Sequence, residues 1–146
     1  MKSKHLGKDT LYQLETYSPS FLDAVKRNSP KEAAIYFGHD YWNAYEFNYL
    51  DDEGLPVLKV LQISIPSSST YTVESKSLKL YLNAFYKKSY SSDIDVLGKI
   101  IKDLSKLTKS LVEAKFLRKF NPEPEALNIN TTKRVNTNPS QVIKFT

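Results

Sequence analysis

The stretch "TVESKSLKLYLNAF", residues 72–85, decides how the centre of the chain folds. From Glu74 onward its apolar residues recur at three- and four-residue spacing, so that Leu78, Tyr81, Leu82 and Phe85 share one helical face. Glutamate and serine directly before such a run are typical of a helix start, where side-chain oxygens accept hydrogen bonds from unpaired backbone N–H groups. The stretch therefore predicts an amphipathic helix that begins near Glu74.

The same helix start is also a candidate binding site. Its unpaired N–H groups and partial positive charge, surrounded by Ser75, Lys76, Ser77 and Lys79, would suit a phosphate group. The Glu74 carboxylate could accept two N–H groups from the edge of a guanine-like base. From spacing alone the capping interpretation is favoured, because serine and glutamate are common at helix starts whatever the function.

Upstream of this helix the sequence predicts a β-hairpin. The segments "WNAYEFNYL" (42–50) and "PVLKVLQISI" (56–65) are rich in aromatic and β-branched residues and flank a turn at residues 51–54. In the second segment the odd-numbered positions from 57 to 65 alternate with the even-numbered ones, as in a strand with one buried face. A polar loop, "PSSSTY", leads from there back to the helix.

Downstream, the pattern predicts a second helix and then a strand. Ser92 and Asp95 have capping-box spacing and open a run whose apolar residues recur with helical period, with lysines opposite: Ile94, Leu97, Ile101, Leu104 and Leu107. The segment "SLVEAKFLRKF" (110–120) alternates again, with Val112, Ala114 and Phe116 on one side. The order of elements indicates an α+β fold, ββααβ(β), in which an antiparallel sheet carries a pair of helices on one face.

The two ends of the chain are expected to lie outside the core that the central segments form. Residues 1–35 are expected to form an arm that contains a short helix. Ser18 would cap this helix and Pro19 would begin it, and its small apolar face would consist of Phe21, Leu22 and Val25. Residues 36–120 form the predicted core. Residues 121–146 follow a proline-rich break and are expected to be a polar tail or one or two final strands.

Composition limits the classes of function. The chain has 146 residues, 40% of them hydrophobic, which is typical of one compact domain. It has no cysteine, so disulfides, thiolate metal sites and a cysteine nucleophile are excluded, and with only His5 and His39 we expect no metal site. The net charge of +5 is scattered and includes few arginines, so we expect no direct contact with nucleic acid. Without a long apolar run or a secretory signal, no membrane association and a cytoplasmic location are expected.

A resemblance adds to these patterns. The string Glu74-Ser75-Lys76-Ser77-Leu78-Lys79 and the residues that follow it to Phe85 resemble the signature of the NADPH-dependent 7-cyano-7-deazaguanine reductases, the nitrile reductases of queuosine biosynthesis. The segments "DYWNAYEFNYLDDEGLPVL" (40–58) and "LYQLETYSPSFLDAVKR" (11–27) are similar to two further parts of that family. The resemblance implies a tunnelling fold (T-fold) and NADPH as cofactor. It also implies substrate contacts by Glu74 and Ser75, and cofactor contacts, or ordering of the site, by Ser75, Lys76, Ser77 and Lys79.

The resemblance also has a gap, because the chain looks like the first half of the family's two-module form. That form carries its catalytic cysteine and a Phe-His-Glu element in the second half, and here the corresponding positions read Phe47-Asn48-Tyr49-Leu50 and Tyr86-Lys87-Lys88-Ser89-Tyr90. A nitrile is a poor electrophile and needs a thiolate to add to its carbon, so no catalytic residue is assigned and the isolated chain is expected to be inactive.

Several hypotheses follow from the missing cysteine. In the first, the chain is half of a 7-cyano-7-deazaguanine reductase, and a homologous subunit that bears the cysteine, a homo-oligomer, or both complete the site. In the second, it is a non-catalytic module that binds a deazapurine and is associated with nucleic-acid modification. An active reductase of altered mechanism and a plain structural role stay open as further alternatives.

Overall fold

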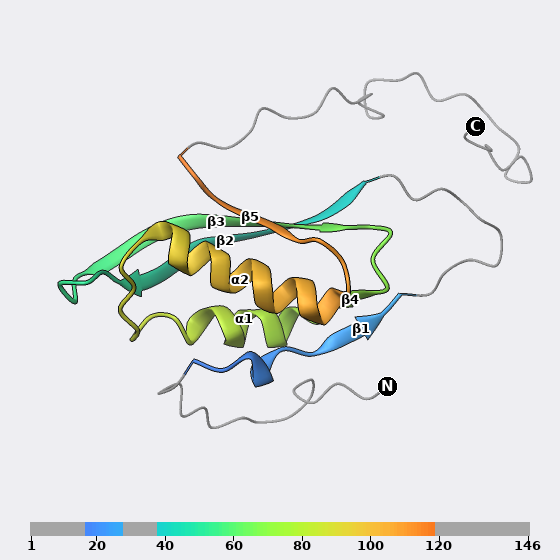
Figure 1. The fold of residues 1–146 in the computed structure, drawn as a ribbon, viewed down its shortest axis with the longest axis horizontal. Helices are drawn as coiled ribbons and strands as arrows, with labels where there is room; N and C mark the ends of the chain where they lie inside the picture. Colours follow the sequence, from blue (N-terminus) through green and yellow to red (C-terminus); the bar gives the residue numbers. More distant parts are fainter. Residues whose placement is uncertain (1–16, 28–37, 119–146) are drawn as a thin grey trace, which may run out of the picture.

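The computed structural model describes residues 17–27 and 38–118, which form a helix pair packed on one face of an antiparallel sheet. Figure 1 shows both helices on the same side of the sheet. The sheet has the strand order β2-β3-β5, and β1 and β4 pair in a second, two-stranded antiparallel sheet. The elements are the 3-10 helix η1 (Pro19–Phe21), β1 (Ala24–Lys26), β2 (His39–Leu50), β3 (Pro56–Pro66), β4 (Tyr71–Val73), α1 (Ser75–Asn83), α2 (Asp93–Thr108) and β5 (Glu113–Leu117).

The predicted α+β order is confirmed, since β2, β3, α1, α2 and β5 follow one another as ββααβ. This is the arrangement of a tunnelling fold. The further strand or strands expected between residues 121 and 146 lie outside the described residues. Neither of the described helices has the length and apolarity needed to cross a membrane.

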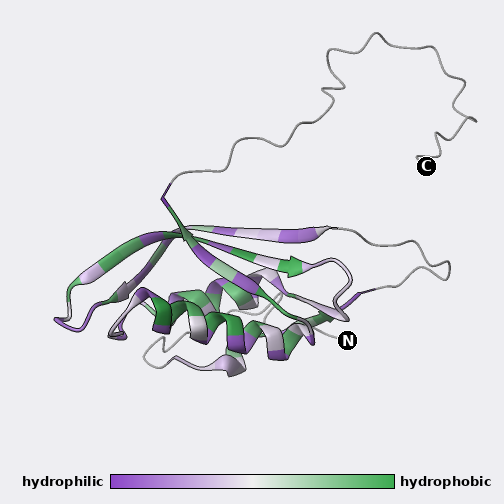
Figure 2. Cartoon of the chain, turned by 45° about the horizontal axis from the view of Figure 1, so that its top comes forward, coloured by the Kyte–Doolittle hydropathy of each residue, from purple (hydrophilic) through white to green (hydrophobic). Residues whose placement is uncertain are grey.

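The predicted hairpin is confirmed and contains an irregularity. β2 and β3 pair from His39 opposite Pro66 to Leu50 opposite Pro56, with a register shift between Ala44 and Phe47. The shift is a β-bulge that places one extra residue on β2. The hydrophilic turn between β2 and β3 forms the tip of the hairpin in Figure 2.

The bulge explains which residues of β2 face the helices. Strict alternation would keep even-numbered residues on one face throughout. With the extra residue, Trp42 and Ala44 before the bulge and Phe47 and Tyr49 after it all pack on the core. β3 has no such break, and its residues Leu61, Ile63 and Ile65 are buried as its alternation predicts.

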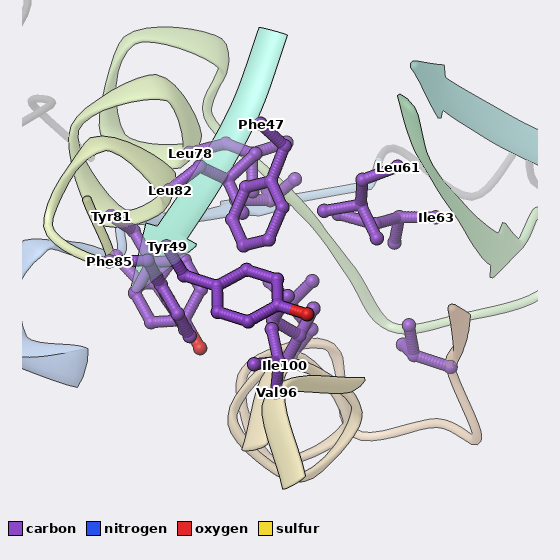
Figure 3. Close-up of a cluster of buried hydrophobic side chains, with 14 of the residues drawn as sticks. Phe47, Tyr49, Leu61, Ile63, Leu78, Tyr81, Leu82, Phe85, Val96 and Ile100 are labelled. Carbon is purple, nitrogen blue, oxygen red and sulfur yellow. The ribbon is translucent and has the colours of Figure 1, made fainter. Parts of the chain in front are cut away.

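The core lies between the sheet and the two helices, as Figure 3 shows. The predicted α1 face is confirmed, since Leu78, Tyr81, Leu82 and Phe85 are all buried. Phe85 contacts Phe47 of β2, with ring centroids 5.4 Å apart, and Phe47 in turn stacks on Phe116 of β5 at 5.9 Å. Aromatic contacts of this kind stabilise a core beyond the area that they bury.

The predicted buried face of α2 is partly wrong. Ser92 caps the helix as expected, and its hydroxyl accepts the Asp95 N–H at 3.2 Å. The buried stripe, however, is centred on Val96, Ile100 and Leu104, and Ile94 is 80% exposed. Both rows are apolar with helical period, so periodicity alone does not decide which row points to the sheet.

The short helix expected in the N-terminal arm is also corrected. Ser18 caps it and Pro19 begins it as predicted, but the helix is a single 3-10 turn that ends at Phe21. The chain then runs as β1, where Ala24 pairs with Val73 of β4, and Val25 is 44% exposed. The strand pairing satisfies backbone groups that a longer helix would have used internally.

Candidate functional site

Helix α1 begins at Glu74, whose carboxylate caps two backbone N–H groups. Its Oε1 accepts the Lys76 N–H at 2.9 Å, and its Oε2 accepts the Ser77 N–H at 2.8 Å. The Ser75 hydroxyl donates a further bond to Oε1 at 3.3 Å, and Glu74 is 9% exposed. The capping interpretation of Glu74 is confirmed, and the negative charge also suits the positive end of the helix dipole.

Ser77 joins the start of α1 to the N-terminal arm. Its hydroxyl donates to the Glu74 carbonyl at 2.7 Å and accepts the Asp23 N–H at 3.0 Å. The Glu74 N–H donates in turn to the Asp23 carbonyl at 3.0 Å. Because Ser77 is fully buried, its hydroxyl orders the helix start from within the fold.

A cavity of about 690 Å³ lies between α1 and β2. This volume is typical of ligand-binding pockets. The cavity is lined on one side by residues 42–48 of β2, with Ile63 of β3 beside them. On the other side it is lined by Ser75, Leu78, Lys79, Leu82 and Asn83 of α1 and by Tyr86.

The structure divides the predicted site residues into two groups. Ser75 and Lys79 lie one helical turn apart and line the cavity together. Glu74, Lys76 and Ser77 lie at the same helix start but do not line the cavity. The signature therefore reaches the cavity through two of its five predicted polar side chains.

The cavity also holds polar residues that sequence reasoning missed. Glu46 lies in the bulge of β2, and Asn43, Asn48 and Asn83 line the same cavity. The signal that could have found them is the break in alternation within "WNAYEFNYL", because bulges are common beside functional sites.

Asp40 and Trp42 lie near the start of β2, and Trp42 also lines the cavity. The structure shows that Asp40 accepts hydrogen bonds from the Arg27 guanidinium and, at 3.2 Å, from the Thr72 hydroxyl. Asp40 therefore fastens the two-stranded sheet to the start of β2. Trp42 packs on the core, but within the part of the chain that the structure describes its buried Nε1 has no hydrogen-bond partner.

The tyrosines whose pKa is strongly raised lie apart from this cavity, and two of them belong to a hydrogen-bond network in the fold. The hydroxyls of Tyr17 and Tyr81 both donate to Asp103, Tyr81 at 2.8 Å. Burial is the main cause that raises the pKa of both tyrosines well above the usual range. The hydrogen bond to Asp103 adds to it for Tyr17, and the interaction with Tyr17, followed by the Asp103 charge, adds to it for Tyr81. Burial and the charge of Asp103 also raise the pKa of Tyr90 to about 12. These phenols stay protonated at neutral pH. Those of Tyr17 and Tyr81 act as hydrogen-bond donors, whereas the buried Tyr90 hydroxyl has no hydrogen-bond partner among the described residues.

The cavity offers binding groups without a strong nucleophile. Its charged residues are Glu46 and Lys79, of opposite sign, and its neutral groups include Ser75 and amide side chains. The whole sequence contains no cysteine. Such a set can orient a polar, planar ligand, but it has no soft nucleophile to add to a nitrile carbon.

Comparison with known proteins identifies the class to which this fold and site belong. The family model described as nitrile reductase, 7-cyano-7-deazaguanine-reductase N-term, matches residues 12–116. A protein from Desulfotalea psychrophila named NADPH-dependent 7-cyano-7-deazaguanine reductase is 39% identical over 118 residues, which are 77% of this chain and 42% of that protein.

Two further relatives carry the same name. The protein from Acinetobacter baylyi is 35% identical over 73% of this chain and 41% of its own length. The protein from Coxiella burnetii is 33% identical over 80% of this chain and 44% of its own length. The chain belongs to the family of 7-cyano-7-deazaguanine reductase N-terminal modules. It spans about two fifths of the length of these curated relatives.

Proposed function

We propose that this chain is the signature-bearing half of a cytoplasmic 7-cyano-7-deazaguanine reductase, and that a second chain supplies the catalytic cysteine. The complex would reduce the nitrile to the aminomethyl group with NADPH, in queuosine biosynthesis. The observation that carries the proposal is the cavity beside the signature, which Ser75 and Lys79 enter and which has no thiol among its residues. The names of the relatives, and the family model that matches residues 12–116, support the reductase assignment.

The chemistry explains why a cysteine from outside these residues is needed. A thiolate adds to the nitrile carbon while the nitrogen takes a proton, which gives a covalent thioimide. Two hydride equivalents and one further proton then convert that carbon to the aminomethyl group and release the thiolate. NADPH supplies the hydrides when it is bound. The residues of this chain bind and orient, and the cysteine must come from elsewhere.

Glu74 can cap the helix and hold the substrate at the same time. A carboxylate offers about four lone-pair positions, and three are used by the Lys76 N–H, the Ser77 N–H and the Ser75 hydroxyl. One position is left, and a second becomes available if the Ser75 hydroxyl turns away from its long bond. Glu74 therefore keeps acceptor positions for the two N–H groups of a guanine-like edge, but it is 9% exposed and does not line the cavity, so its assignment as a substrate contact rests on the family signature.

The helix start fits NADPH only through its side chains. The N–H groups of Lys76 and Ser77 already donate to Glu74, so they are not available to bind a phosphate. The Lys79 side chain is exposed at the cavity and the Ser75 hydroxyl lies one turn before it. We therefore assign cofactor contacts to Lys79 and Ser75 first, with Lys76 beside them, and an ordering role to Ser77.

The second candidate is a deazapurine-binding module without catalysis, which the thiol-free cavity also favours. One experiment separates the two. The chain is purified alone and with a cysteine-bearing homologous chain, and NADPH oxidation is followed with 7-cyano-7-deazaguanine. We expect oxidation only from the mixture. Activity of the chain alone would remove the need for a second chain, and an inactive complex that still binds the deazapurine would favour the second candidate.

A further inference from the structure

Glu46 supplies the only carboxylate among the described residues that line the cavity between α1 and β2. Its side chain is exposed, and within residues 17–27 and 38–118 its carboxylate forms no hydrogen bond or ion pair. The ammonium group of Lys79, across the cavity on α1, has no such partner in the same part of the chain. Since the two charges do not pair with each other, each is available to a group of opposite character on a ligand.

The bulge of β2 brings Glu46 to this position. Within the register shift between Ala44 and Phe47, residues 45 and 46 stand opposite a single residue of β3. Under strict alternation Glu46 would follow Ala44 in the row that packs on the core, where an unpaired carboxylate is strongly unfavourable. With the extra residue, Phe47 takes that place and is 3% exposed, while Glu46 stays exposed at the cavity. The Asn48 amide donates to the Glu46 carbonyl at 3.4 Å and so contacts the bulged backbone.

The other acid of the predicted site is held in a different way. The Glu74 carboxylate accepts two backbone N–H groups and one hydroxyl of its own helix, and Glu74 does not line the cavity. Its charge is therefore directed at the first turn of α1. For a base bound in this cavity, Glu46 is the acid that lies next to it.

The cavity suits the edge and the faces of a guanine-like ring. Such a ring presents two adjacent donors on one edge, the ring N–H and the amino group, and a carboxylate accepts both at once with its two oxygens. Leu78 and Leu82 of α1 are buried in the cavity wall, and the Tyr86 ring beside them is 38% exposed. Apolar and aromatic surfaces with a few placed polar groups are typical of pockets for planar ligands.

We propose that Glu46 is a specificity-determining residue of this cavity, whose carboxylate accepts the two adjacent N–H groups of a guanine-like base. The proposal rests on the proposed function, which makes the cavity the site of the deazapurine. An adenine-like ring carries a nitrogen lone pair where a guanine-like ring carries its N–H, and that lone pair would face a carboxylate oxygen. Glu46 thereby selects guanine-like rings and disfavours adenine-like ones.

The test removes one partner of the contact at a time, on the protein and on the ligand. Glu46→Gln keeps the size of the side chain but replaces one acceptor oxygen with an NH₂ donor. Glu113→Gln is the matched control, because Glu113 is also an exposed strand glutamate and does not line the cavity. Calorimetry measures how the full chain binds 7-cyano-7-deazaguanine and its analogue without the amino group, 7-cyano-7-deazahypoxanthine.

We expect the wild-type chain and Glu113→Gln to prefer the ring with the amino group by roughly tenfold, as for one hydrogen bond to a charged acceptor. Glu46→Gln should bind the deazaguanine more weakly and lose that preference, at an unchanged melting temperature. A merely structural role of Glu46 would not change the preference between two ligands that differ in one amino group.

Four outcomes overturn the proposal. The wild-type chain could fail to bind the deazaguanine, although every group that the proposal invokes belongs to this chain. Glu46→Gln could weaken both ligands equally and keep the preference. Glu74→Gln, measured in the same way, could lose the preference while Glu46→Gln keeps it, which would assign the edge of the base to Glu74. Glu46→Gln could weaken NADPH binding alone, which would assign Glu46 to the cofactor.

NADPH oxidation separates this proposal from the proposed function. Loss of the preference in Glu46→Gln, with no NADPH oxidation by the chain mixed with a cysteine-bearing homologous chain, leaves the recognition role of Glu46 standing and removes the reductase. Oxidation by that mixture, with binding and preference unchanged in Glu46→Gln, leaves the reductase standing and removes the role of Glu46.

Discussion

Replacing Ser77 by alanine tests whether the signature serves the fold or the ligand at this position. The Ser77 hydroxyl is fully buried and holds the Asp23 N–H, which lies in a residue only 8% exposed. Alanine removes that acceptor. The Glu74 carbonyl loses one donor but keeps the Leu78 N–H at 2.9 Å, so it is not left alone. The cost of the substitution therefore comes mainly from one buried N–H without a partner.

The size of the effect follows from that count. A buried donor left unpaired costs about 1–3 kcal/mol, so we take a loss of about 2 kcal/mol in the free energy of unfolding. For a domain of roughly 100 residues each kcal/mol corresponds to about 4–8 °C, which gives a fall in melting temperature of about 8–16 °C. Ser75→Ala should change stability by less than about 0.5 kcal/mol, because Ser75 is exposed and its hydroxyl makes only a 3.3 Å bond.

The assay is urea unfolding of both variants, followed by the fluorescence of Trp42, the single tryptophan of the chain. A Ser77→Ala protein that unfolds at the wild-type urea concentration would refute the reasoning, since no buried N–H would then depend on the hydroxyl. A variant of unchanged stability that binds NADPH more weakly in the complex would instead give Ser77 a ligand contact.

Three further predictions concern neighbouring interactions. Glu74→Ala should lower stability by about 1–2 kcal/mol through loss of the cap and also weaken deazapurine binding; a lower melting temperature with unchanged binding would leave only the cap. Partial burial raises the pKa of Asp93, but hydrogen bonds from Tyr49 and Lys59 lower it on balance. Its stabilisation is thus present above the unfolded pKa of about 3.9 and lost as pH falls through the folded value. Asp93→Asn, which removes a partly exposed pair worth about 0.5 kcal/mol, should therefore differ from wild type at pH 7 and converge with it in acid, as urea unfolding across pH would show. Tyr81→Phe and Tyr17→Phe should each cost about 1 kcal/mol, and because the two hydroxyls share one carboxylate, a double-mutant cycle that is strictly additive would contradict the network.

Local patterns predicted the elements whose signal is contained in a few turns or one strand. The helical period that puts Leu78, Tyr81 and Phe85 on one face can be recognised from the local sequence alone. The same holds for the strand alternation that ends in Ile63 and Ile65. Glu74 was readable as a cap for the same reason, since its partners are two and three residues away. These parts of the fold could be predicted because sequence neighbours satisfy them.

What could not be predicted depends on contacts between distant segments. β1 and β4 are three residues each and exist through their pairing, which joins Ala24 to Val73. Segments so short carry no period of their own. The rotation of α2 depends in the same way on how Ile100, rather than its neighbour Ile101, meets the sheet. The cavity depends on the bulge of β2, which the break in alternation within "WNAYEFNYL" signals but whose position is fixed only by the register with β3.

The signature itself can be divided by helical geometry, and that division explains its composition. Residues one turn apart lie on the same face of a helix, whereas residues two apart are rotated by about 200° (3.6 residues per turn). Ser75 and Lys79 are four apart and both line the cavity, while Ser77, between them, points into the fold and holds the arm. A short run of polar residues thus serves two opposite faces of the helix, and Glu74, as the N-cap, holds the first turn in place. Residues 22–24 contact the face of α1 that carries Ser77, and the cavity lies on the opposite face. The position of residues 22–24 therefore influences how α1 is rotated, and with it the direction in which Ser75 and Lys79 point.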